Sequence, residues 1–120
     1  MDLTPVRDEG LAFVEGRPDA ALMRGARDGA RVLEACFSAG ARATLLYANN
    51  LPPAFFDLSS GEAAAVLQQF RNYGVRLAVV LGPGAIMPSS RFAEMVAEER
   101  RRSYFGVFES RPEALAWLRE

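Results

Sequence analysis

Short apolar runs alternate with amphipathic segments along most of the chain, and this alternation restricts the fold more than any other feature. The runs 43–48, 77–81 and 104–108 are almost continuously apolar, which is typical of strands buried on both faces. A segment with helical periodicity follows each run, after a short loop. Alternation of this kind predicts an α/β domain with a parallel or mostly parallel sheet.

The first part of the chain predicts a hairpin or a broken strand, because residues 6–8 and 11–15 flank Glu9-Gly10. A first helix is expected from about residue 20, secure only near Asp28 and ending at Gly40, because Gly25 and Gly29 weaken its early turns. We expect its buried face to contain Leu22 or Met23, Ala26, Ala30, Leu33 and Phe37.

Three further helices are expected. The second follows Ser59 and buries Ala63, Val66, Leu67 and Phe70; the third is capped by Ser90 and buries Phe92 or Ala93, Val96 and Ala97; the fourth opens with the capping box Ser110–Glu113. The sequence therefore predicts a single domain over residues 1–120, with an N-terminal hairpin or strand, a mostly parallel sheet and about four helices.

The composition removes most catalytic and metal chemistry. All fourteen cationic residues are arginine, and the chain has neither lysine nor histidine. Schiff-base and P-loop lysines, histidine-dependent triads and histidine metal sites are thereby excluded within this chain. The single cysteine, Cys36, allows no internal disulfide and no cysteine-rich metal cage. We therefore expect no enzymatic activity, no cofactor and no metal.

Charge and hydropathy give expectations about partners and location. The net charge is −1, and the basic run 100–102 directly follows two glutamates, which is typical of a solvated helix end. A nucleic-acid surface would need a broader basic footprint. No apolar run approaches the roughly 20 residues of a membrane span, and the N-terminus lacks a signal region. We expect a cytoplasmic protein that binds neither nucleic acid nor membrane.

The stretch before the second helix concentrates the candidate functional residues. Ser59 and Glu62 have capping-box spacing, and Asp57 is the alternative cap. Phe55-Phe56 is interpreted first as a core anchor and second as a partner contact. Exposed hydroxyls at a helix start would also suit an anion site or a phosphorylation switch. Ser60 beside Gly61 is the hydroxyl to which the sequence assigns no structural role.

A second candidate site lies where the expected strands end. Asn49-Asn50 follows one buried strand, and Gly82-Pro83-Gly84 follows the next. Turn chemistry explains both first, and ligand contact at the carboxyl ends of the strands explains them second. The alternative function is therefore a small-ligand or anion-binding domain that uses this crevice, with Asn49, Asn50, Ser59, Ser60 and Gly82 as its contacts.

The central motif resembles a known family. The run from Asn50-Leu51 through Phe55-Phe56-Asp57-Leu58-Ser59-Ser60-Gly61 to Leu67-Gln68, Phe70 and Asn72-Tyr73 closely resembles the bacterial family known as domain of unknown function 4180. The segments 76–80 and 108–114 are similar to the same family, so the resemblance covers about 28–120. The family has no assigned activity, so the resemblance implies a fold relationship only.

A more distant resemblance is to anti-sigma-factor antagonists of the STAS type. These place an Asp-Ser-Ser-Gly or Asp-Ser-Thr-Gly step between a strand and a helix, and Asp57, Ser60 and Gly61 match that step, with Leu58 as one extra residue. The resemblance implies a STAS-like architecture in which Ser60 is the hydroxyl that a partner kinase modifies.

Together these observations predict a non-catalytic interaction or regulatory module. Its working surface would be Asn50–Glu62, with phosphorylation at Ser59 or Ser60 as the switch and another protein as the partner. A homodimer formed through exposed Phe or Trp surface is the alternative assembly.

Overall fold

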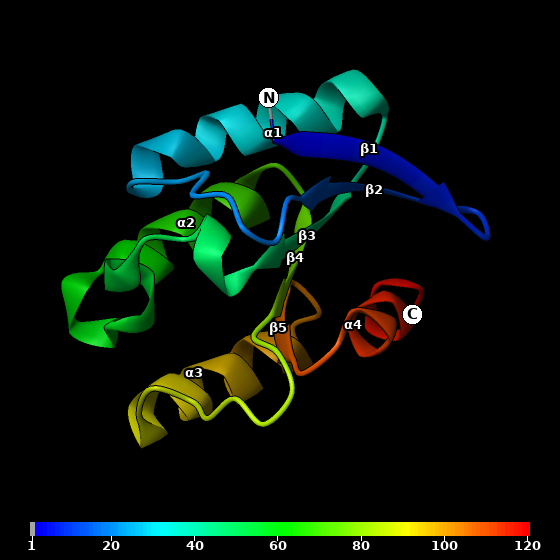
Figure 1. The fold of residues 1–120 in the computed structure, drawn as a ribbon. Helices are drawn as coiled ribbons and strands as arrows, with labels where there is room; N and C mark the ends of the chain where they lie inside the picture. Colours follow the sequence, from blue (N-terminus) through cyan, green and yellow to red (C-terminus); the bar gives the residue numbers. More distant parts are fainter. Residues whose placement is uncertain (1) are drawn as a thin grey trace.

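The five strands form one mixed sheet in which neighbours in space are also neighbours in sequence, in the order β1-β2-β3-β4-β5. The computed structural model describes residues 2–120, and Figure 1 shows the arrangement. The strands are β1 (Leu3–Asp8), β2 (Leu11–Gly16), β3 (Ala43–Tyr47), β4 (Arg76–Val80) and β5 (Phe105–Phe108). Only β1 and β2 are antiparallel; the other pairs are parallel, as the strand–helix alternation predicts.

The hairpin at the start of the chain is confirmed. Glu9 and Gly10 both have positive φ, 50° and 84°, which is the conformation of a tight two-residue hairpin turn. The strands extend further than predicted on both sides of this turn, so that all six residues of β1 pair with β2.

Four helices cover the sheet unequally. They are α1 (Gly29–Ala39), α2 (Glu62–Asn72), α3 (Ser90–Arg101) and α4 (Arg111–Leu118). The first three contribute to one apolar cluster and α4 to the other, so that among the helices of residues 2–120 α4 alone packs on the second face. Within the described residues, no helix has the length and apolar character needed to cross a membrane.

The buried face of α2 is as predicted, and that of α1 is predicted only in part: Met23 and Leu33 are buried as expected. Ala30 and Phe37 are exposed, Phe37 by 53%, while Gly29, Val32, Leu33 and Cys36 face the core. The helix is rotated so that Val32 and Cys36 are buried together with Leu33. Gly29 faces α2, where a Cβ would meet the end of the Gln69 side chain, so a larger residue there would require that side chain to move.

The helix starts differ from the prediction by small shifts. Ser89, not Ser90, caps α3, because its hydroxyl accepts the Phe92 amide at 3.1 Å. For α4 one half of the predicted capping box is confirmed: the Ser110 hydroxyl accepts the Glu113 amide at 3.4 Å, while among the described residues the Glu113 carboxylate makes no return bond to the Ser110 amide. In both helices the cap residue has extended backbone angles, which orient the hydroxyl toward the first turn.

One arginine holds the carboxyl end of α4. Arg76 donates to the carbonyls of Leu118 at 2.9 Å and Trp117 at 3.2 Å, and its Nε donates to the Ser103 carbonyl at 2.7 Å. Its guanidinium also lies 4.2 Å from the centre of the Trp117 ring. Since Trp117 is only 4% exposed, it belongs to the core and offers no surface to a partner.

We predict that Arg76→Ala lowers the free energy of unfolding by about 2–3 kcal/mol, because the last carbonyls of α4 lose a charged donor. Arg76→Lys should restore only part of the loss, since an ammonium cannot reproduce the planar guanidinium fork. Chemical denaturation measures both variants. Arg102→Ala, at an exposed position, is the control. Equal stability of Arg76→Ala and Arg102→Ala would contradict the role assigned to Arg76.

Candidate functional site

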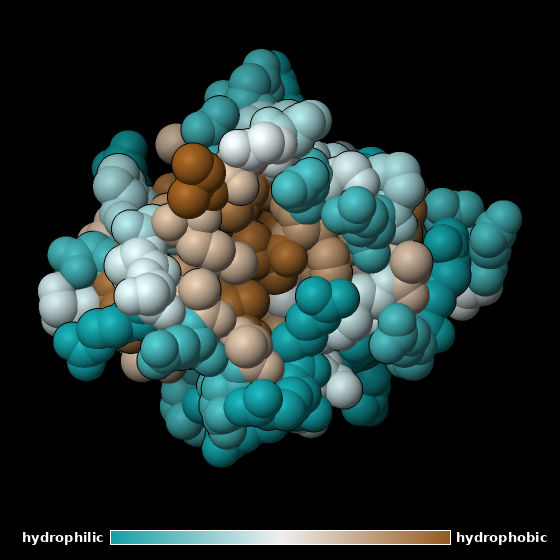
Figure 2. All heavy atoms as spheres, turned by 90° about the horizontal axis from the view of Figure 1, so that it is seen from below, coloured by the Kyte–Doolittle hydropathy of each residue, from teal (hydrophilic) through white to brown (hydrophobic). Residues whose placement is uncertain are grey.

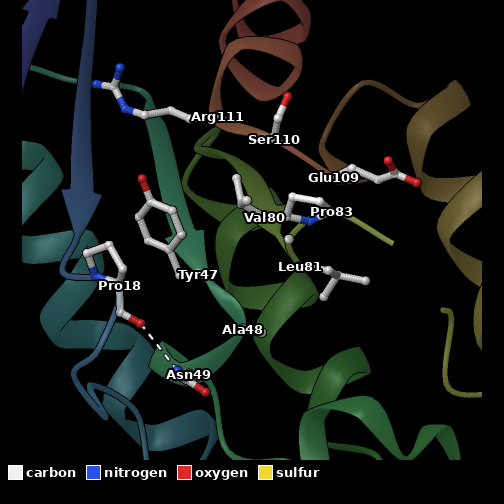
Figure 3. Close-up of a pocket in the computed structure, with 11 residues that line it drawn as sticks. Pro18, Tyr47, Ala48, Asn49, Val80, Leu81, Pro83, Glu109, Ser110 and Arg111 are labelled. Carbon is white, nitrogen blue, oxygen red and sulfur yellow. Dashed lines mark hydrogen bonds between the residues drawn. The ribbon is translucent and has the colours of Figure 1, made fainter. Parts of the chain in front are cut away.

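A crevice of about 390 Å³ opens at the carboxyl ends of the parallel strands. Figure 3 shows how its walls are placed: Tyr47 and Pro18 stand on one side, Val80 and Pro83 on the other. The complete lining is Pro18, Tyr47, Ala48, Asn49, Val80, Leu81, Gly82, Pro83, Glu109, Ser110 and Arg111. The side chains come from the ends of β3 and β4 and from the start of α4, which the parallel order brings to one edge.

Asn50 lies in the interior next to this edge and holds the backbone there through hydrogen bonds. Its side chain is fully buried and enters where β2 and β3 stop pairing, accepting the Tyr47 amide at 2.7 Å. Its amide nitrogen donates to the carbonyls of Arg17 and Ala20, both at 2.7 Å. These bonds satisfy the side chain, as a buried amide requires. The turn interpretation of Asn50 is confirmed, and its side chain is not exposed to a ligand.

The other residues of the second candidate site divide between two places. Asn49 and Gly82 line the crevice, and the Asn49 amide nitrogen donates to the Pro18 carbonyl at 3.4 Å. Ser59 and Ser60 do not line it. The structure therefore separates the strand-end residues from the hydroxyls before α2.

Three polar side chains form a cluster beside the crevice that the sequence analysis missed. The Tyr47 hydroxyl donates to a Glu15 carboxylate oxygen at 2.5 Å. Arg111 forms two bonds to the same carboxylate, at 2.9 and 3.0 Å. The available signal was positional: Glu15 and Tyr47 are the polar groups near the ends of otherwise apolar strands, but nothing local links them to Arg111.

The ionisation of this cluster follows from its contacts. Burial, together with the neighbouring Glu15 carboxylate, raises the pKa of Tyr47 to about 12. Burial alone would raise the pKa of Glu15, but hydrogen bonds from Arg111 and Tyr47 outweigh it and lower the pKa. The bond to Glu15 raises the pKa of Arg111. At neutral pH the cluster is thus fixed as a neutral phenol and an ion pair.

The helix start before α2 differs from the predicted capping box. The Ser59 amide and hydroxyl both donate to Asp57, at 3.1 and 2.7 Å, within a short 3-10 helix, Leu58–Ser60. The α-helix begins only at Glu62, after Gly61 at φ 80°. Glu62 does not return to Ser59; its carboxylate accepts the Ala26 amide at 2.7 Å. The capping-box prediction is wrong because the left-handed Gly61 separates the two turns.

Ser60 has a structural role that the sequence did not indicate. Its hydroxyl donates to the Ala54 carbonyl at 2.5 Å and accepts the Glu62 amide at 3.1 Å. The expectation that folding leaves this hydroxyl unused is therefore wrong. We call the group Ala54, Ser60 and Glu62 the serine latch. The Ser60 side chain remains exposed at the surface while it makes these bonds.

The two phenylalanines before the latch have different environments. Phe55 is fully buried and packs edge to face against Phe92 and Phe105, at centroid distances of 6.3 and 5.9 Å. Phe56 is half-buried and lies beside the Phe92 ring. The core-anchor interpretation is confirmed for Phe55, while Phe56 keeps an accessible edge.

Apolar surface is exposed on the side of the molecule where β5, α3 and α4 lie. Seen from below, hydrophobic residues surround a hollow and are bordered by hydrophilic ones (Figure 2). The loop 81–88 lies on this side and carries Ile86, which is 89% exposed. A separate aromatic pair, Phe37 and Tyr73, packs edge to face at 5.6 Å and is also exposed.

Comparison with known proteins gives one match. The family described as "Domain of unknown function (DUF4180)" matches residues 9–118, so the match begins earlier than the region around Asp28 that carried the resemblance. No curated protein and no solved structure matches the chain. The resemblance to STAS proteins stays a prediction.

The raised pKa of Tyr47 predicts a loss of stability in alkali. A group whose pKa is higher in the folded state contributes stability below its unfolded value of 10.0, and loses it as the pH rises toward about 12. The free energy of unfolding of the wild type should therefore fall across this window. The free energy of unfolding of Tyr47→Phe should fall less steeply with pH. Burial also raises the pKa of Cys36, but this contribution is the same in both proteins and cancels in the difference between the two curves. Parallel curves would contradict the assignment.

Proposed function

We propose that this chain, which belongs to the DUF4180 family, is a non-catalytic binding module that takes a small ligand in the crevice at the carboxyl ends of β3 and β4. The observation that supports it is the cavity itself, which lies outside the carboxyl ends of the parallel strands β3 and β4. Its volume of about 390 Å³ lies within the usual range for small-molecule sites. Apolar walls and a few polar groups, among them Asn49 and Ser110, are the usual composition of such sites.

The state of the ionisable groups supports binding over catalysis. A general acid or base works best with a pKa near the operating pH. The Tyr47 pKa of about 12 is far from neutrality, and Arg111 is held in its ion pair with Glu15. Within residues 2–120, no group of three or more His, Cys, Asp or Glu side chains is arranged to hold a metal.

A thermal-shift screen with a blocked variant tests this function. A ligand present at 100 times its dissociation constant should stabilise the wild type by about 2.7 kcal/mol. Ala48→Trp, which fills the crevice, should abolish the shift, whereas Ala65→Trp on the exposed face of α2 should keep it. A broad metabolite library without any hit, or a hit that Ala48→Trp also binds, would count against the crevice.

We propose as a second function that the segment Asn50–Glu62 binds a protein partner and that modification of Ser60 switches this binding. The serine latch supports it, because one exposed hydroxyl holds two backbone groups. A phosphate would remove the donor to Ala54 and would add negative charge between Asp57 and Glu62. The segment would then lose its present conformation. The resemblance to STAS proteins also implies that Ser60 is the hydroxyl that is modified.

Ser60→Ala should lower the free energy of unfolding by about 1 kcal/mol, since two backbone groups lose their partner at an exposed site. Ser60→Asp should also speed amide exchange over residues 54–62. It should weaken capture of a partner from the native host, while Ser59→Ala should not. Phosphopeptide mapping over residues 54–71 identifies the modified serine. Partner capture that is indifferent to Ser60→Asp would refute the switch.

A further inference from the structure

The hydrogen-bonding groups of the crevice are unequally used. Two of the donors are engaged: Arg111 uses Nε and Nη2 on Glu15, and the Asn49 amide nitrogen bonds to Pro18. Arg111 Nη1 and the Ser110 hydroxyl keep hydrogens that can be donated. Among residues 2–120, neither the Asn49 side-chain oxygen nor the Glu109 carboxylate has a side-chain hydrogen bond or an ion pair. The site therefore offers a ligand an amide oxygen and a carboxylate whose acceptor capacity is unused.

The start of α4 does not reverse this balance. A helix N-terminus attracts anions through its free amides. Here the second helical residue is Pro112, which has no amide hydrogen, and the Glu113 amide already bonds to Ser110. Only the amide of Arg111 is left without a competing partner from the cap, so an anion would gain little at this end.

The charges around the crevice point the same way. Glu15 and Arg111 cancel each other in a bidentate pair, and Glu109 remains as an exposed residue at the edge, with its carboxylate directed away from Tyr47 (Figure 3). Its charge would repel an approaching anion and attract an approaching cation at a distance. The aromatic ring of Tyr47 adds a surface of the kind on which organic cations bind.

We infer that the crevice accepts a small organic cation, an amine or a guanidinium on an apolar body, and disfavours anions. The inference rests on the proposed ligand-binding function and decides its chemical class. The apolar body would pack against Val80 and Pro83, and the cationic group would meet the Tyr47 ring and the Asn49 oxygen. Glu109 would act at longer range from the rim.

Three matched probes test the class of ligand: 2-phenylethylamine, 2-phenylethanol and 3-phenylpropionate, which share a ring and differ in charge. Amide chemical shifts of the full ¹⁵N-labelled chain report binding, with Ala48, Asn49, Leu81 and Ser110 as crevice reporters. We expect the amine to bind most tightly and the carboxylate least. Glu109→Gln should weaken the binding of the amine about threefold, which is the effect expected from the loss of one exposed charge. Glu113→Gln, on α4 but outside the crevice lining, is the matched control.

The outcomes separate this inference from the function on which it rests. If the carboxylate or the alcohol shifts the crevice amides with equal or higher affinity, the cation preference is wrong and the binding site stands. If none of the three probes shifts those amides, both are wrong. If Glu113→Gln weakens the amine as much as Glu109→Gln does, the rim carboxylate has no specific role and the electrostatic argument fails.

Discussion

The contact between Arg76 and the last turn of α4 closes the second face of the sheet. A helix of eight residues is too short to be stable by itself in water, and its last carbonyls have no partners within the helix. Arg76 reaches from β4 to donate to two of them and stacks on Trp117. At the opposite end, Arg111 is paired with Glu15 of β2. Arg76 and Arg111 thus connect the two ends of α4 to β4 and β2, in addition to the Ser110 cap at its start.

The crevice depends on the same helix and on one buried amide. The position of α4 brings Ser110 and Arg111 to the edge where β3 and β4 end. Asn50 ends the pairing of β2 with β3 by occupying the Tyr47 amide with its own side chain. The separation of these strands leaves room beside Tyr47. The residues that open the site are therefore structural, and the residues that would contact a ligand are their neighbours.

The helix start before α2 shows how one exposed side chain can hold two backbone groups, and the proposed switch depends on those two bonds. The spacing of Ser59 and Glu62 predicts a sufficient cap, and this prediction leaves Ser60 without a structural role. In the folded chain Asp57 caps the 3-10 turn, and Ser60 connects that turn to Ala54 and to α2. A hydroxyl with this structural use is a better switch than a free one, because its modification changes the backbone around it.

The sequence by itself determined the elements and the order in which they occur, since apolar runs, hairpin turns and caps such as Ser110 depend on residues within a few positions of one another. The buried face of α2 follows from the same local periodicity, and the core-anchor role of Phe55 follows from the size of its aromatic ring. The buried face of α1 did not follow from periodicity, because it depends on how the helix packs against the sheet and against α2, where Gly29 meets Gln69, forty residues away in sequence. The Tyr47–Glu15–Arg111 cluster and the serine latch were likewise decided by the tertiary structure. The residues in each group come from separate elements or from turns on either side of a left-handed glycine. No local sequence pattern indicates that these residues lie close together in the folded chain.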